Sequence, residues 1–373
     1  MTEARSDGGS GPNGARQEEE LLVPVSVELA PIRQLLVIDI NDDPTYRGLE
    51  PQVLEQPDGT SGLVLLAYRH DDQVELYADV GVKVDAAGYD GLGQGLTDIY
   101  RTAFAPARYE VTTSGLQVDI AFNAPNGRSI ELHLHEHLPR GRDDFTALAP
   151  VGGAFTNPEF FPFLWLPSLS FVPVRGTQVS VRIDGEDRTI ARLPVPVGGR
   201  RCLMARYDPH IMVCQVNPNS NAHAFGVSAD GVRESGSTPL DVDVCDVDGR
   251  PAVSAVSVRR GQHVCAVRLD PPLPDLRRLP EGTPVEGAIV LEADSVAQVQ
   301  GSYRIARRDG RIDMVIDRIG PWRTRQRRPL LAFLFRIPTF RRWPTTYRWE
   351  ATIELTDPPS LRSHWLRQVT THP

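Results

Sequence analysis

The chain has 373 residues, a length that favours two domains or one large β domain. Its formal net charge of −8 at pH 7 argues against a general nucleic-acid binder, because phosphate contacts need a basic surface. Four cysteines without CxxC spacing argue against a zinc knuckle or a thioredoxin-type redox pair. The 31 glycines and 32 prolines lie between short apolar runs, which indicates many strands joined by turns.

The pattern of short apolar runs predicts an all-β protein with two tandem domains. Residues 1–20 are polar and lack an apolar signal-peptide core, so we expect a disordered tail and a cytoplasmic location. A β domain is predicted over 21–175 and a second over 176–358, with a tail at 359–373. Each domain is expected to be an antiparallel β-barrel or β-sandwich with few short helices. No apolar run approaches the roughly 20 residues that span a bilayer.

Two segments of the first domain carry clear periodicity. Apolar and polar residues alternate over 73–85, which predicts a strand with one buried and one polar face. Residues 95–104 carry leucine, isoleucine, tyrosine and phenylalanine near helical spacing. This segment is therefore predicted as a short helix.

A three-stranded meander is predicted next, and its turns fix its register. The turn Pro125-Asn126-Gly127 predicts a three-residue loop with Ala124 facing Arg128. Apolar residues then face each other across these two strands, as Phe122 with Ile130, Ile120 with Leu132 and Val118 with Leu134. A two-residue loop at Ser114-Gly115 is expected to match the preceding strand in the same way, with Val111 opposite Val118 and Tyr109 opposite Ile120.

The polar face of this meander is the candidate site. His133, His135 and His137 occupy alternate positions of one strand, and the two registers place Glu110 and Asp119 in the row of His133. We therefore treat Glu110 and Asp119 as candidate catalytic carboxylates and the three histidines as candidate metal ligands. Asp119 or Glu110 is alternatively a further ligand or the group that fixes the imidazole tautomer. Zinc is the first metal to consider, and iron or manganese stay open. The alternative is that these side chains form the wet face of a half-buried sheet.

Aromatic residues concentrate among the prolines and glycines of 145–171. One interpretation is an aromatic plug that closes a core, and the other is the mouth of an apolar ligand cavity. The candidate ligand-binding residues are Phe160, Phe161, Phe163 and Trp165.

The segment 318–348 carries nine arginines and no Asp or Glu, opposite in sign to the whole chain. With its apolar run at 330–335, it could lie at a bilayer interface, where arginines meet anionic headgroups. The alternative is a hairpin whose arginines pair with the acidic remainder of the chain. RNA binding is less favoured, because the aromatics are interleaved with aliphatics. The candidate membrane or anion contacts are Arg327, Arg328, Arg341, Arg342 and Trp343.

In layout, with two β halves and aromatic, cavity-like segments, the chain resembles two-domain lipocalin-like proteins of the carotenoid hydratase and tocopherol cyclase type. The resemblance implies a cavity for a lipophilic molecule, with carboxylates moving protons at a double bond. We therefore expect binding of a lipophilic small molecule near a membrane surface, with acid/base conversion (hydration, isomerisation or cyclisation) as an added activity. A metal-dependent enzyme using the histidine strand is one alternative, and a non-catalytic membrane-surface or interaction protein is another. The sequence leaves open whether the chain is an enzyme, what its ligand is and its oligomeric state.

Overall fold

The predicted all-β class is confirmed. The computed structural model describes residues 21–56, 58–84, 95–138, 141–150, 158, 160–218, 225–227, 232–235, 238–325, 336–337 and 341–367. Within these ranges the regular secondary structure is almost wholly β-strand, with short 3-10 helices at η2 (Leu276–Arg278) and η3 (Trp343–Thr346). None of the helices in the described ranges is long and apolar enough to cross a membrane.

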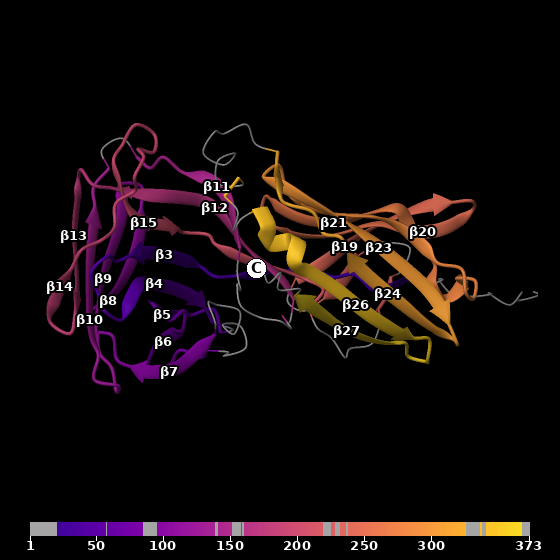
Figure 1. Cartoon of the computed structure of the whole chain (residues 1–373), viewed down its shortest axis with the longest axis horizontal. Coiled ribbons are helices and arrows are strands. Elements are labelled where there is room, and N and C mark those ends of the chain that lie inside the picture. The colour runs from indigo at the N-terminus through magenta and orange to yellow at the C-terminus, as the bar shows by residue number, and fades with distance from the viewer. Residues whose placement is uncertain are drawn as a thin grey trace, which may run out of the picture.

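Two lobes lie side by side, and the first is drawn in indigo to magenta (Figure 1). A five-stranded antiparallel sheet in this lobe has the order β14-β13-β10-β9-β8, and a ten-stranded sheet has the order β2-β16-β12-β15-β3-β4-β5-β6-β7, with β11 paired to β12. The strands of the smaller sheet are β8 (Ala107–Thr112), β9 (Gly115–Asn123), β10 (Ser129–Glu136), β13 (Thr177–Ile183) and β14 (Glu186–Arg188). Those of the larger sheet are β2 (Val27–Pro31), β3 (Gln34–Asp39), β4 (Tyr46–Glu55), β5 (Ser61–Arg69), β6 (Val74–Asp79), β7 (Leu96–Thr102), β11 (Phe145–Pro150), β12 (Phe161–Pro173), β15 (Cys202–Asp208) and β16 (Met212–Val216).

The second lobe is one antiparallel ten-stranded sheet, drawn in orange to yellow (Figure 1). Its order is β18-β19-β20-β21-β22-β23-β24-β26-β27, with β25 paired to β23. Its strands are β18 (Val232–Ser235), β19 (Thr238–Val247), β20 (Arg250–Arg260), β21 (His263–Pro274), β22 (Val285–Ala293), β23 (Ala297–Arg308), β24 (Arg311–Asp317), β25 (Arg323–Thr324), β26 (Tyr347–Glu354) and β27 (Ser360–Arg367). A small two-stranded sheet pairs β1 (Leu21–Val23) with β17 (Phe225–Val227).

Strand pairing crosses the expected division at residue 176. Strand β13 pairs with β10 and β16 pairs with β2, so residues 177–216 hydrogen-bond within the sheets of the first lobe. The division of the chain into separate folding units stays a prediction. The expected C-terminal tail from residue 359 instead contains β27, which pairs with β26 over Ser360–Arg367. Residues 1–20 and 368–373 lie outside the described residues.

The expected helix over 95–104 is wrong, because this segment forms strand β7. It pairs in parallel with β6 at the edge of the larger sheet. The ring of Tyr100 stacks on Tyr77, with centroids 5.3 Å apart. Backbone pairing along an otherwise open sheet edge outweighs a weak local helical periodicity.

The long strand β12 takes part in the hydrophobic cores of both lobes. Phe161 and Phe163 pack in the core shared with the second lobe, whereas Val172 packs between the two sheets of the first lobe. Trp365 of β27 reinforces the junction, because its indole N–H is shared between the carbonyl oxygens of Val216 (3.0 Å) and Asn217 (2.8 Å). The lobes are therefore joined by buried aromatic contacts and by hydrogen bonds.

Replacing Trp365 by alanine is expected to lower the free energy of unfolding by about 3–5 kcal/mol, because a large buried ring is lost. Urea denaturation followed by circular dichroism measures the change. Val195→Ala is the matched control, since Val195 is 54% exposed and its truncation should cost less than about 0.5 kcal/mol. Equal destabilisation by the two substitutions would contradict this account of the junction.

Candidate functional site

Strand β10 presents His133 and His135 on the outer face of the five-stranded sheet. Ile130, Leu132 and Leu134 alternate with them and are at most 2% exposed, inside the core of the first lobe. Successive side chains of a strand point to opposite faces, so burial of the aliphatic residues turns the histidines outward. The His133 and His135 side chains are 44% and 34% exposed. Solvent therefore reaches both imidazoles.

The predicted register between β9 and β10 is confirmed, and Asp119 pairs with His133. The connecting turn has the expected geometry. The Ala124 N–H donates to the Arg128 carbonyl at 2.7 Å, and Gly127 has a left-handed φ of 84°. The turn chemistry thus fixes which carboxylate lies beside the histidines.

The carboxylate of Asp119 joins the two histidines. Its Oδ1 lies 2.5 Å from His133 Nδ1, and its Oδ2 lies 2.8 Å from His135 Nε2. Partial burial raises the pKa of Asp119, but the hydrogen bonds from His135 and His133 outweigh this effect and lower the pKa below its ordinary value. The ionised form is thereby favoured, and it is the form that binds metal ions.

Asp119, His133 and His135 have the geometry of a metal-ligand set. One donor atom from each residue lies within 4.8 Å of the donor atoms of the other two. Two imidazole nitrogens and one carboxylate oxygen suit zinc and also non-haem iron. Three protein ligands leave at least one coordination position for water or a substrate.

His137 does not join this set. Strand β10 ends at Glu136, and the His137 backbone N–H donates to the Gly176 carbonyl at 2.9 Å beyond the strand. The exposed His137 side chain is not part of the ligand group formed by the described residues. The structure thus brings two of the three candidate histidines, His133 and His135, together with Asp119.

Glu110 does not lie beside Asp119, contrary to the prediction. Strand β8 is displaced by two residues, so that Arg108 pairs with Asp119 and Glu110 pairs with Gln117. The Arg108 guanidinium lies 2.8 Å from Glu110 and 3.9 Å from Asp119. The hydrogen bond from Arg108 lowers the pKa of Glu110. Glu110 is thus held as an ion-pair partner, which does not suit a general acid.

The displaced register results from the role of Gly115. Thr112 pairs with Gly115, so the turn consists of Thr113 and Ser114. A Cβ at Gly115 would lie 2.7 Å from the Glu136 carbonyl oxygen, and the Gly115 φ is 135°. Glycine is needed here for close approach to β10 and not for the turn. Thr112 Oγ1 accepts a hydrogen bond from the Ser114 N–H at 3.2 Å, which supports the turn in place of a glycine.

The candidate ligand-binding aromatics are packed in the core. Phe161, Phe163 and Trp165 are at most 2% exposed, and Phe161 stacks on Trp343 with centroids 5.1 Å apart. Phe160, just before β12, is half-buried. These contacts agree with the interpretation of an aromatic plug that closes a core. A cavity for a lipophilic ligand stays a prediction.

The structure describes only part of the predicted membrane or anion contact. Arg327 and Arg328 lie outside the described residues, whereas Arg341 and Arg342 are exposed just before η3. Trp343 is 5% exposed and belongs to the core between the lobes, so its ring is not available to a membrane surface. Contact between the arginines and a membrane stays a prediction.

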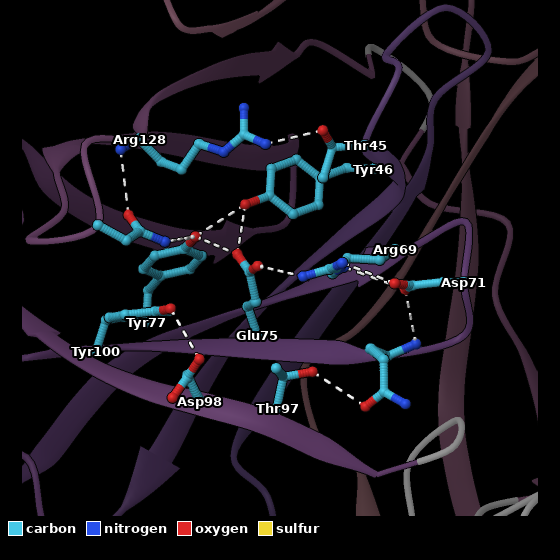
Figure 2. Close-up of polar contacts among 12 residues, drawn as sticks. Thr45, Tyr46, Arg69, Asp71, Glu75, Tyr77, Thr97, Asp98, Tyr100 and Arg128 are labelled. Atoms are coloured by element: carbon cyan, nitrogen blue, oxygen red, sulfur yellow. Dashed lines mark hydrogen bonds and ion pairs between the residues drawn. The ribbon is translucent and has the colours of Figure 1, made fainter.

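A buried polar network that the sequence did not predict centres on Glu75 (Figure 2). The Glu75 Oε2 atom accepts hydrogen bonds from Tyr46 Oη at 2.5 Å and from Tyr77 Oη at 2.6 Å. Arg69 donates to Glu75 Oε1 at 3.2 Å, and Asn126 donates to Tyr77 Oη at 3.1 Å. Each oxygen of the buried carboxylate therefore has a partner, as a stable buried charge requires.

The alternation over 73–85 predicted one buried and one polar face, but Glu75 and Tyr77 on the expected polar face of β6 are also buried. Residues Val74, Leu76 and Ala78 are buried on one face, and Glu75 and Tyr77 are buried on the other. Both faces of this strand are covered. Tyr77 follows Glu75 by two residues, so the two side chains lie on the same face of the strand. This spacing is the signal in the sequence that could have indicated a buried network.

Glu136 forms a second buried cluster on the inner face of β10. It is 3% exposed, and its Oε2 accepts from Tyr207 Oη at 2.7 Å and from the Leu116 N–H at 3.0 Å. Burial raises the pKa of Glu136, and the hydrogen bond from Tyr207 only partly offsets this effect. Glu136 follows Leu132 and Leu134 at the same spacing, so its inward orientation is readable from the alternation.

The Glu75 network should make the protein sensitive to alkaline pH. Burial, and then the hydrogen bond to Glu75, raise the pKa of Tyr46 and Tyr77 above the ordinary value of 10.0. Their contribution to stability is complete below about pH 10 and falls as the pH rises further, because the unfolded tyrosines ionise first.

We expect Tyr46→Phe to reduce the slope of unfolding free energy against pH above pH 10 by about 1.4 kcal/mol per pH unit. Urea denaturation of the wild type and the variant over this pH range measures the slope. Identical slopes would show that the Tyr46 hydroxyl is not held protonated by the fold.

The chain was compared with protein-family models, with curated proteins and with solved structures, and no match was found in any of the three. The resemblance in layout to lipocalin-like proteins therefore stays a prediction.

Proposed function

We propose that this protein binds a divalent transition-metal ion, with Zn²⁺ as the first candidate, through Asp119, His133 and His135, and that it is a metal-dependent enzyme. The observation that carries the proposal is the convergence of one carboxylate and two imidazoles within 4.8 Å. The partial exposure of the two histidines is compatible with this function, because catalytic zinc sites keep one coordination position open to water or substrate.

The rigidity of the surrounding sheet favours this function. His133 and His135 are on one strand, and Asp119 is on its hydrogen-bonded neighbour. Strand β13 pairs with the other edge of β10, where Ser180 faces His133 and Gln178 faces His135. Ligands on the inner strands of a sheet are positioned more precisely than ligands on loops.

A bound ion would supply Lewis-acid chemistry at its open position, by polarising an oxygen or lowering the pKa of a water molecule. The role of the chain is to hold the three ligands and to keep Asp119 ionised. Arg108 provides a competing positive charge 3.9 Å from Asp119. This charge should weaken binding of a dication without preventing it.

Zn²⁺ is expected to bind the wild type at one ion per chain, and binding should be lost in the double variant His133→Ala with His135→Ala. Isothermal titration calorimetry, with metal analysis after dialysis, measures affinity and stoichiometry. His137→Ala is the matched control and should bind like the wild type, because His137 lies outside the ligand set. Absence of stoichiometric binding by the wild type would refute the proposal.

Removing the competing charge should strengthen the site. We expect Arg108→Ala to tighten Zn²⁺ binding about threefold to tenfold at low ionic strength, with a smaller gain at high salt. Arg182→Ala is the control, because Arg182 is also exposed on this sheet and also pairs with a glutamate, Glu131 at 3.3 Å, but forms no ion pair with Asp119 among the described residues. A gain of the same size in both variants would mean that only the net charge matters.

Binding of a lipophilic small molecule has weaker support, because Phe161, Phe163 and Trp165 are buried in the core. It stays a prediction that native mass spectrometry can test by detecting a co-purifying lipid.

A further inference from the structure

A pocket lies along strand β23 of the second lobe, between the part that pairs with β24 and the part that pairs with β25. Strand β23 pairs with β24 over Ser302–Arg308 and with β25 at Ala297 and Gln298. Between these two stretches, the segment 318–322 lies beside β23, where the Gly320 N–H donates to the Gln300 carbonyl. A cavity of about 240 Å³ lies there, lined by Gln300, Gly301, Ser302, Arg318, Gly320, Pro321 and Arg323.

The walls of this pocket are held in place by hydrogen bonds. The Gly320 N–H donates to the Gln300 carbonyl at 2.7 Å, and Ser302 Oγ donates to Asp317 Oδ1 at 2.7 Å. A Cβ at Gly301 would lie 3.1 Å from the Asp317 carbonyl oxygen. The segment 318–322 is therefore tightly apposed to β23, and the pocket is formed before any ligand binds.

Arg318 adopts a backbone conformation that is unfavourable for its residue type. Its φ is 51°, in the left-handed region that non-glycine residues with long side chains rarely occupy. Such strain tends to occur at functional sites. Arg318 thus lies at the rim of the pocket, at a position whose conformation glycine would adopt more readily.

The two arginines of the pocket have no acidic partner among the described residues. The nearby Arg304 lies 3.3 Å from Glu286, and Arg325 lies 2.6 Å from Glu292. Arg318 and Arg323 are exposed but form no such pair in the described part of the chain. The nearest acid in the sequence, Asp317, accepts the hydrogen bond of Ser302. The pocket thus concentrates unpaired positive charge on a chain whose net charge is −8.

We propose that this pocket binds a phosphate group through Arg318 and Arg323. Guanidinium groups recognise phosphate oxygens with paired N–H donors, and arginine is the preferred residue for such recognition. The Gln300 amide adds a neutral polar group to the lining, whereas the Ser302 hydroxyl is engaged with Asp317. The pocket size fits a single phosphate group on a small organic molecule or on a lipid headgroup. This site is independent of the metal site on the first lobe.

Titration with inorganic phosphate and with glycerol phosphate, in metal-free buffer containing a chelator, tests the proposal. Saturable binding by the wild type is expected, and the double variant Arg318→Gln with Arg323→Gln should bind at least about tenfold more weakly. The double variant Arg308→Gln with Arg311→Gln is the charge-matched control, because both arginines are exposed outside the pocket. This control should bind like the wild type. Near-ultraviolet circular dichroism checks that the variants are folded.

Flotation with phosphatidylcholine vesicles, with and without phosphatidic acid, separates the two sources of phosphate. Flotation that needs phosphatidic acid and is lost in the double variant would assign the pocket to a lipid headgroup. Phosphate binding without flotation would assign it to a phosphorylated small molecule. No phosphate binding by the wild type, or equal weakening in the Arg308→Gln with Arg311→Gln control, would overturn the proposal.

Discussion

The candidate site depends on the burial of one face of strand β10. Leu132 and Leu134 are at most 2% exposed in the core of the first lobe, and removing either from water is worth about 1.5–3 kcal/mol. A shift of β10 by one residue would expose both and bury the histidines. The same hydrophobic burial that forms the lobe therefore fixes His133 and His135 on the outer face beside Asp119.

The carboxylates of Glu75 and Asp119 differ in burial and in their hydrogen-bond partners. Glu75 lies in a closed network in which each carboxylate oxygen has a partner, which suits a structural role. Asp119 instead shares its oxygens between two half-exposed imidazoles, and these are groups that a metal ion can recruit. Solvent access to Asp119, His133 and His135, and not burial of charge, distinguishes the proposed metal site from the interior networks.

Local sequence signals predicted the site where turn chemistry and alternation agreed, as at Gly127 and along β10. These signals failed where a residue is required for a contact with a residue far away in the sequence. Gly115 was assigned to a turn, but its lack of a side chain serves the approach of Glu136. The polar face of β6 was expected in solvent but is covered by other strands, which alternation alone does not reveal. Paired sequence positions thus predicted that Asp119 lies beside His133 and His135, but not that Arg108 pairs with Asp119.

X-ray absorption spectroscopy at the zinc edge on the Zn²⁺-loaded wild type tests the metal site most directly. Two imidazole ligands and one carboxylate oxygen are expected at about 2.0–2.2 Å, together with at least one water oxygen. The imidazole scattering should disappear in the double variant His133→Ala with His135→Ala. A first shell of oxygen atoms alone, or imidazole scattering that survives in the double variant, would contradict the assignment of this site.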